Sequence, residues 1–78
     1  MSNRTITMLI KNPGHTLVRL TGLVNRHRFS LRSLLLEETD TENVSKLRLT
    51  VAAEDEHRFV QLFRVLDKQL DVVDITVD

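Results

Sequence analysis

The chain has 78 residues, and its 11 basic and 11 acidic side chains give a formal charge of zero. Nucleic-acid-binding domains usually carry a basic excess, so this balance argues against nucleic acid as a partner. Cysteine is absent, which excludes a disulfide scaffold. A chain this short buries only about 60% of its unfolded surface and often gains stability by association. We therefore expect a dimer or a larger complex.

The N-terminal residues Met1-Ser2-Asn3-Arg4 contain no apolar segment of the kind found in a signal peptide. No later run approaches the ~20 apolar residues that span a bilayer. The sequence therefore predicts a soluble, cytoplasmic protein without membrane contact.

Residues 4–11 alternate between apolar and polar side chains, with Ile6, Met8 and Ile10 on one face. A period of two with β-branched residues predicts a strand. The turn Asn12-Pro13-Gly14 ends this strand, because proline cannot donate to a ladder and glycine frees the backbone. A helix is expected next, from about His15 to His27.

The predicted helix 15–27 is amphipathic, since its main apolar residues fall within one arc: Leu17, Leu20, Leu23 and Val24. Val18 and Gly22 lie one helical step apart on the other side. Glycine inside a helix costs about 1 kcal/mol relative to alanine. Gly22 is therefore either a tolerated surface glycine or part of a smooth strip where a second helix approaches.

A second strand is predicted at residues 29–37, where Phe29, Leu31, Ser33 and Leu35 would share one face. Leu34 and Leu36 place apolar groups on the other face as well. Such a strand is either covered on both sides or pairs at an edge with another chain. The acidic segment 37–43 has no apolar residue and lacks the spacing of a calcium loop, so it is predicted to be a solvated connection.

The third strand, residues 44–53, has the clearest alternation, with Leu47, Leu49 and Val51 on one side. Three acids at 54–56 then mark the start of a second helix, where they complement the helix dipole. This helix runs to about Lys68, with apolar residues at helical spacing: Phe59, Leu62, Phe63, Leu66 and, extending the series, Leu70. Glu54 and Arg58 are spaced to form an ion pair. The last strand is predicted at 71–77, with these side chains inward: Val73, Ile75 and Val77.

The order β-α-β-β-α-β predicts an α+β fold of the ferredoxin-like type, with a four-stranded antiparallel sheet and two helices on one face. Residues 1–78 would form this single domain. An RNA-recognition domain has the same order but needs stacking aromatics on its third strand, which are absent here. A heavy-metal-binding domain of this topology needs Cys-x-x-Cys, and the chain has no cysteine.

Catalytic patterns are absent from the sequence. There is no nucleophile motif, no phosphate-binding glycine loop, and the three histidines share no metal-ligand spacing. No metal site is predicted, and a binding or interaction module is favoured. The turn 12–14 offers helix N-terminal amides, glycine for close approach and the Asn12 amide as partners for an anionic ligand. On these residues alone, an ordinary strand-to-helix turn is the favoured interpretation.

Two segments resemble the amino-acid-binding ACT domain, specifically the short, single-domain type of acetolactate synthase (acetohydroxyacid synthase) small regulatory subunit. The first segment carries these matching residues: Asn12, Leu17, Arg19, Leu20, Gly22, Leu23, Arg26, Phe29, Leu31, Ser33 and Leu34. The second carries these: Lys68, Asp71, Val72 and Val73. Together they extend the resemblance over nearly the whole chain.

The resemblance implies a homodimer through the edge of the second strand, giving an eight-stranded sheet. It also implies a branched-chain amino acid effector between the first loop of one chain and the second strand of the other. The effector-binding residues carried over are Asn12, Gly14, His15 and Thr16, with Ser30 and Leu31 across the interface. This chain would be non-catalytic and would activate a large subunit in valine, leucine and isoleucine biosynthesis, with possible feedback control. Thiamine diphosphate, Mg²⁺ and FAD are expected on that large subunit, and no cofactor is expected on this chain.

The sequence departs from the family pattern at four positions near the proposed site. His15 stands where the family usually has a second glycine, and a side chain there could fill the pocket or alter its preference. Ser30 replaces asparagine, Arg28 replaces glycine and Arg32 replaces glutamate. The alternative function is a free-standing ACT module that senses another amino acid or acts only in assembly.

Overall fold

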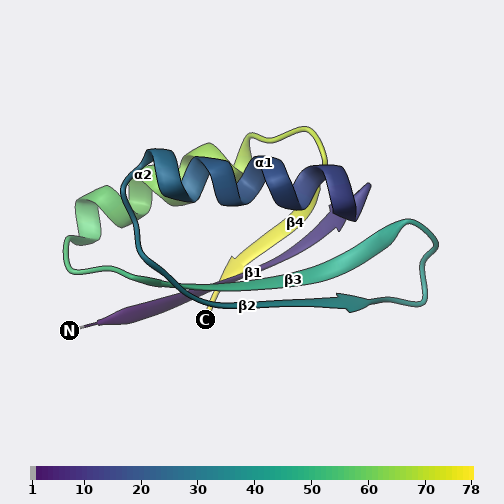
Figure 1. Cartoon of the computed structure of the whole chain (residues 1–78), viewed down its shortest axis with the longest axis horizontal. Helices are drawn as coiled ribbons and strands as arrows, with labels where there is room; N and C mark the ends of the chain where they lie inside the picture. Colours follow the sequence, from purple (N-terminus) through teal and green to yellow (C-terminus); the bar gives the residue numbers. More distant parts are fainter. Residues whose placement is uncertain (1) are drawn as a thin grey trace.

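Two helices lie on one face of a four-stranded antiparallel sheet in the computed structural model, which describes residues 2–78 (Figure 1). The strands have the spatial order β2-β3-β1-β4, and each neighbouring pair is antiparallel. The elements are β1 (Asn3–Lys11), α1 (Pro13–Arg26), β2 (Leu31–Glu38), β3 (Val44–Ala52), α2 (Glu56–Asp67) and β4 (Val72–Val77). The predicted α+β ferredoxin-like fold is confirmed.

The core lies between the sheet and the helices, and the alternating strands supply half of it. The predicted inward residues of β1 and β3 are all buried: Ile6, Met8, Ile10, Leu47, Leu49 and Val51. The helices contribute the apolar residues predicted from their periodicity: Leu20, Val24, Phe59, Leu62 and Leu66. Burying each such side chain contributes about 1.5–3 kcal/mol, so the core accounts for most of the stabilisation of this fold.

The helix boundaries differ from prediction by one or two residues. α1 begins at Pro13 rather than His15, because the fixed φ of proline suits the first helical position, where no donor is needed. α2 ends at Asp67, so Leu70 lies beyond the helix and is 89% exposed. The prediction that Leu70 continues the buried stripe is wrong, since the chain has left the helical repeat by that point.

β2 begins at Leu31 rather than Phe29, and it contains an irregularity at Arg32. Leu31 pairs with Val51, whereas Ser33 pairs with Thr50, so Arg32 is an extra residue in β2. An extra residue in a strand reverses the faces of the residues that follow it. Leu31 therefore shares the face of buried Val51, and Leu35 faces the opposite side of the sheet. The prediction that Leu31, Ser33 and Leu35 share one face is wrong for this reason.

A second irregularity lies in β4, where Ile10 pairs with Val72 and Leu9 pairs with Asp74. Val73 is the extra residue between them and is 54% exposed. Val72 packs against the core in its place, together with the correctly predicted Ile75. The prediction of an inward Val73 is therefore wrong, because the strict alternation assumed from the sequence is broken at this bulge.

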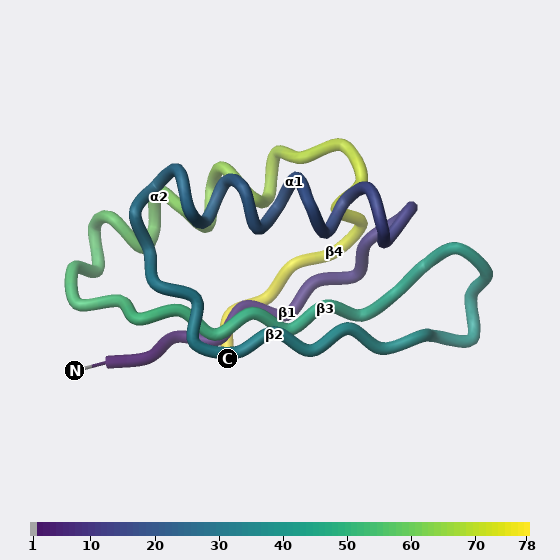
Figure 2. Tube along the Cα trace, viewed as in Figure 1, coloured from purple at the N-terminus to yellow at the C-terminus, as the bar shows by residue number. Residues whose placement is uncertain are grey.

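β2 is an edge strand, which fits one of the two interpretations of its doubly apolar pattern. All eight of its residues are exposed, including four leucines: Leu31, Leu34, Leu35 and Leu36. The trace shows that β2 runs along the border of the sheet and turns into β3 at a hairpin beyond the helices (Figure 2). Within residues 2–78, no helix is long and apolar enough to cross a membrane.

Candidate functional site

The turn between β1 and α1 is fastened to the hairpin between β2 and β3 by two asparagines. The Asn12 backbone N–H donates to the Asn43 carbonyl at 3.3 Å, and the Asn43 side-chain amide donates to Asn12 Oδ1 at 2.9 Å. Both residues have positive φ, 48° and 62°, which asparagine tolerates better than most residues. The Asn12 side chain forms no cap with α1. Its oxygen accepts from Asn43, and no hydrogen bond from its side-chain NH₂ group is found within residues 2–78.

Thr16 is fully buried and stabilises the same turn from the protein interior. Its hydroxyl oxygen lies 2.5 Å from the Lys11 carbonyl oxygen and 3.2 Å from Asp71 Oδ2. The Lys11 N–H in turn donates to the Asp71 carbonyl at 2.8 Å. Thr16 thus connects the start of α1 to the segment before β4, and its side chain has a structural role in the turn.

Gly14 and His15 form the exposed part of the first helical turn. A Cβ added to Gly14 would meet no atom within 4 Å, so in the single chain the glycine leaves open space. His15 Nε2 lies 2.9 Å from an Arg19 guanidinium nitrogen one turn later. Arginine has no acceptor, so in this pair the guanidinium donates and His15 Nε2 accepts. The His15 ring is therefore held along α1 by Arg19.

Ser30 and Leu31 lie at the other end of the sheet from this turn. Leu31 pairs with Val51, which pairs with Arg4 at the start of β1, whereas Asn12 follows the end of β1. Seven residues of strand, at about 3.4 Å each, separate the two ends by roughly 24 Å. Of the six predicted site residues, the fold brings together Asn12, Gly14, His15 and Thr16, and it does not bring Ser30 and Leu31 to them within one chain.

Each end of the sheet has one surface cavity among those found in the described chain. The first, of about 330 Å³, lies beside the Asn12–Asn43 contact and is lined by these residues: Pro13, Glu38, Thr39, Thr41, Glu42, Asn43, Val44 and Ser45. The second, of about 320 Å³, lies at the Ser30 end and is lined by these: Arg28, Phe29, Ser30, Arg32, Ala52, Glu54, Asp55 and Arg58. Of the six predicted effector residues, Ser30 alone lines one of these cavities, and the cavity beside the β1–α1 turn is lined by none of them.

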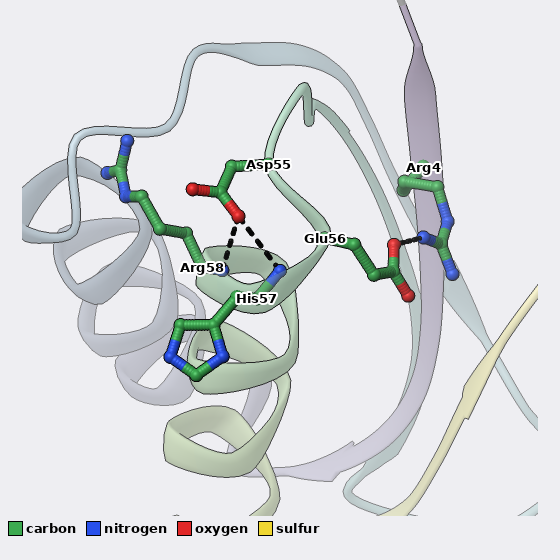
Figure 3. Close-up of polar contacts among 5 residues, drawn as sticks. All are labelled: Arg4, Asp55, Glu56, His57 and Arg58. Atoms are coloured by element: carbon green, nitrogen blue, oxygen red, sulfur yellow. Dashed lines mark hydrogen bonds and ion pairs between the residues drawn. The ribbon is translucent and has the colours of Figure 1, made fainter.

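The start of α2 is stabilised by polar contacts that are structural (Figure 3). The Asp55 carboxylate accepts hydrogen bonds from the backbone N–H groups of His57 and Arg58, at 2.9 and 3.3 Å. Glu56 forms an ion pair with Arg4 of β1. The predicted Glu54–Arg58 pair is not among the ion pairs of residues 2–78. Glu54 precedes the helix, and Arg58 instead donates to the carbonyl of His27 at 2.6 Å.

Across residues 2–78 no three metal-ligating side chains cluster. The sequence missed the engagement of Asn12 by Asn43, because the two lie 31 residues apart and only their turn preference is visible locally. It also missed the convergence of three arginines on the second cavity.

Comparisons with known proteins place the chain in a family. Residues 13–75 match the model of the ACT domain. The chain is 34% identical over 73 residues to the acetolactate synthase small subunit of Bacillus subtilis (strain 168), covering 94% of this chain and 42% of that protein. It therefore spans less than half the length of that relative.

Solved structures agree with this assignment at the level of the fold. The acetolactate synthase small subunit from Thermotoga maritima superposes with a TM-score of 0.83 at 23% identity, over 99% of this chain and 47% of that one. The ACT domain of GTP pyrophosphokinase from Chlorobium tepidum superposes with a TM-score of 0.81 at 14% identity, over 97% and 96% of the two chains. With the family model covering most of its length, this chain belongs to the ACT domain family.

Proposed function

We propose that this chain is a regulatory, non-catalytic small subunit of acetolactate synthase, acting in branched-chain amino acid biosynthesis. The observation that carries the proposal is its 34% identity to a protein of that name across 94% of this chain. The fold alone would not suffice, because the ACT domain of a GTP pyrophosphokinase has nearly the same structure. In this proposal, catalysis and its thiamine diphosphate, Mg²⁺ and FAD belong to the large subunit, which this chain activates.

The proposed homodimer forms through β2. This edge strand exposes four leucines, between 37% and 45% each, beside its unpaired backbone groups. Such an edge is a template for pairing with another strand. The outer side of α1 offers a second contact, since Val18 is 72% exposed and Gly22 presents no side chain. Two copies related by a two-fold axis would pair their β2 strands antiparallel and continue the sheet.

This dimer would complete the effector site. In one chain Asn12 and Ser30 lie at opposite ends of the sheet, but antiparallel β2 strands place the start of one strand near the end of the other. Ser30 and Leu31 of the partner subunit would then approach Asn12, Gly14 and His15. The exposed first-turn amides of α1 suit the carboxylate of an amino acid, and the partner's Leu31 suits a branched aliphatic side chain.

Reconstitution with the cognate large subunit tests the regulatory role. We expect added small subunit to raise acetolactate synthase activity and to co-sediment with the large subunit. Unchanged activity and sedimentation would contradict the proposal. The variant Arg64→Gln changes one exposed residue of α2. As a control for a substituted and purified protein, it should activate the large subunit as the parent chain does.

Calorimetric titration with valine, leucine and isoleucine tests the effector. We expect heat from at least one of the three, with one equivalent bound per chain. The variant His15→Gly, which removes the side chain that Arg19 holds along the first turn of α1, should bind the same ligand more tightly. Heat from none of the three ligands in either protein would reject a branched-chain effector.

The second candidate is an ACT module that senses another amino acid or acts only in assembly. It is favoured by one observation, the imidazole of His15 on the exposed first turn of α1, directly after Gly14, which has no side chain. A large subunit stimulated without any response to branched-chain amino acids would support an assembly role. Binding of a different amino acid, found by screening the twenty in the same calorimeter, would support the sensing role.

A further inference from the structure

Three arginines converge on the cavity at the end of the sheet opposite the β1–α1 turn. This cavity, of about 320 Å³, lies between the connection from α1 to β2 and the connection from β3 to α2. Arg28, Arg32 and Arg58 line it. Figure 3 shows the Arg58 side chain on the opposite side of the start of α2 from Arg4. Arg4 pairs with Glu56, whereas Arg58 lines the cavity. Small-molecule sites typically have volumes of about 300–1,000 Å³.

Arg58 is held in place before any ligand arrives. One guanidinium nitrogen donates to the His27 carbonyl at 2.6 Å, and the guanidinium carbon lies 5.2 Å from the centre of the Phe29 ring. These contacts use one of its five N–H donors and leave others free. A side chain that is already ordered loses little further entropy on binding, which favours affinity.

Arg28 and Arg32 occupy special backbone positions. Arg28 has a φ of 64°, in the left-handed region where asparagine or glycine would be less strained. Arg32 is the extra residue in the irregularity between Leu31 and Ser33. Bulges of this kind re-aim a side chain relative to the regular strand. Neither position requires arginine for the fold, and both arginines are exposed.

The positive charge of this cavity is not neutralised by its two acidic residues. Asp55 accepts two backbone hydrogen bonds at the start of α2. None of the three arginines has a carboxylate within 4.0 Å among residues 2–78, where the ion pair is Arg4–Glu56. Arginine keeps its charge at all ordinary pH values. The lining therefore carries three fixed positive charges against two negative ones, one of which is already engaged.

We propose that this cavity binds the phosphate group of a small phosphorylated molecule, with the guanidinium groups of Arg28, Arg32 and Arg58 as its donors. The planar fork of arginine matches phosphate oxygens in pairs. A phosphate group also brings more acceptor oxygens and more charge than a carboxylate, which suits three converging arginines. Within one chain the cavity lies at the opposite end of the sheet from the β1–α1 turn, and Ser30 is the one predicted effector residue that lines it. The proposal does not depend on the identity of a catalytic partner.

The test is an NMR titration of the ¹⁵N-labelled chain with inorganic phosphate, with sodium chloride keeping the ionic strength constant. We expect saturable shifts confined to residues 28–32 and 52–58. Losing one charge-assisted hydrogen bond costs about tenfold in affinity or more, so Arg28→Asn and Arg32→Gln should each weaken binding by at least that factor. Asparagine tolerates the backbone of residue 28, so the first variant should keep its fold.

Arg64→Gln is the matched control, because it removes the same charge from the exposed face of α2 outside the cavity. It should bind phosphate as the parent chain does. Shifts that do not saturate, or an equal loss of affinity in Arg64→Gln, would overturn the site. An equal response to acetate at the same concentration would overturn the assignment to phosphate. Failure of this titration leaves the large-subunit reconstitution unaffected, so the two proposals are tested separately.

Discussion

β3 with α2 and β2 with α1 form two contrasting pairs of elements in this small domain. β3 is a central strand whose inward residues are completely buried, and α2 begins with a side-chain cap from Asp55. β2 is an edge strand with every residue exposed, and α1 begins at a left-handed Asn12 without a side-chain cap. The contrast teaches that β3 and α2 are stabilised by contacts within the chain, whereas β2 leaves its leucines exposed, as the proposed dimer requires.

The largest expected effect comes from truncating a buried leucine of β3. Leu49→Ala should lower the free energy of unfolding by about 2–5 kcal/mol, because it leaves a cavity under the helices. Urea denaturation followed by circular dichroism measures this loss. Leu34, which pairs directly with Leu49 on β2 and is 39% exposed, provides the comparison. Leu34→Ala should lower the free energy of unfolding of the dilute chain by less than half as much. Equal losses would contradict the conclusion that β3 contributes more to stability than β2.

The next effect concerns self-association. Leu35→Glu should weaken the proposed dimer by about tenfold or more, because it replaces an apolar edge contact by two facing carboxylates, equivalent to about 1.4 kcal/mol. In its own chain the new carboxylate lies opposite Arg48, so the monomer should remain stable. Sedimentation velocity over a range of concentrations measures the change.

Val73→Glu is the matched control for this variant, since Val73 is 54% exposed on the opposite edge strand, β4. The dimer should tolerate this second variant. If Val73→Glu dissociates the protein and Leu35→Glu does not, the chain associates through β4, and the proposed completion of the effector site is wrong.

The cap of α2 should contribute a smaller amount. Asp55→Ala removes the acceptor of two backbone N–H groups and should cost about 1 kcal/mol in unfolding free energy. Asp67→Ala, at the last residue of the same helix, removes an identical group outside any cap and should change stability by less than about 0.5 kcal/mol. Thermal unfolding of both variants gives the comparison, and equal losses would show that Asp55 does not act as the cap.

The smallest effect addresses the two interpretations of Gly22. A Cβ at this position meets nothing within 4 Å in the single chain, so Gly22→Ala should raise the stability of the dilute chain by up to about 1 kcal/mol through helix propensity. Chemical denaturation at several protein concentrations measures this gain. A gain that turns into a loss at high concentration would place Gly22 in a contact between copies.

Much of the fold followed from local pattern, and the errors in strand faces have a common cause. The alternation of β1 and β3 and the helical spacing of Phe59, Leu62 and Leu66 predicted the buried residues correctly. The faces of Leu35 and Val73 were wrong, because each follows or occupies an irregularity in strand pairing. Strand pairing depends on residues far away in the chain, so periodicity alone cannot reveal where a register shifts.

The candidate site divides in the same way. The sequence by itself determined the element order and predicted a turn at Asn12 and Gly14, because turn chemistry and helix starts are local properties. The prediction of a ligand at this turn came from the resemblance to the ACT domain. Only the tertiary structure decided that Asn43 engages Asn12, that Thr16 is buried on Asp71, and that Ser30 lies at the far end of the sheet. Those relations join segments brought together by the pairing of β1 with β3 and β4, and no spacing along the chain encodes them.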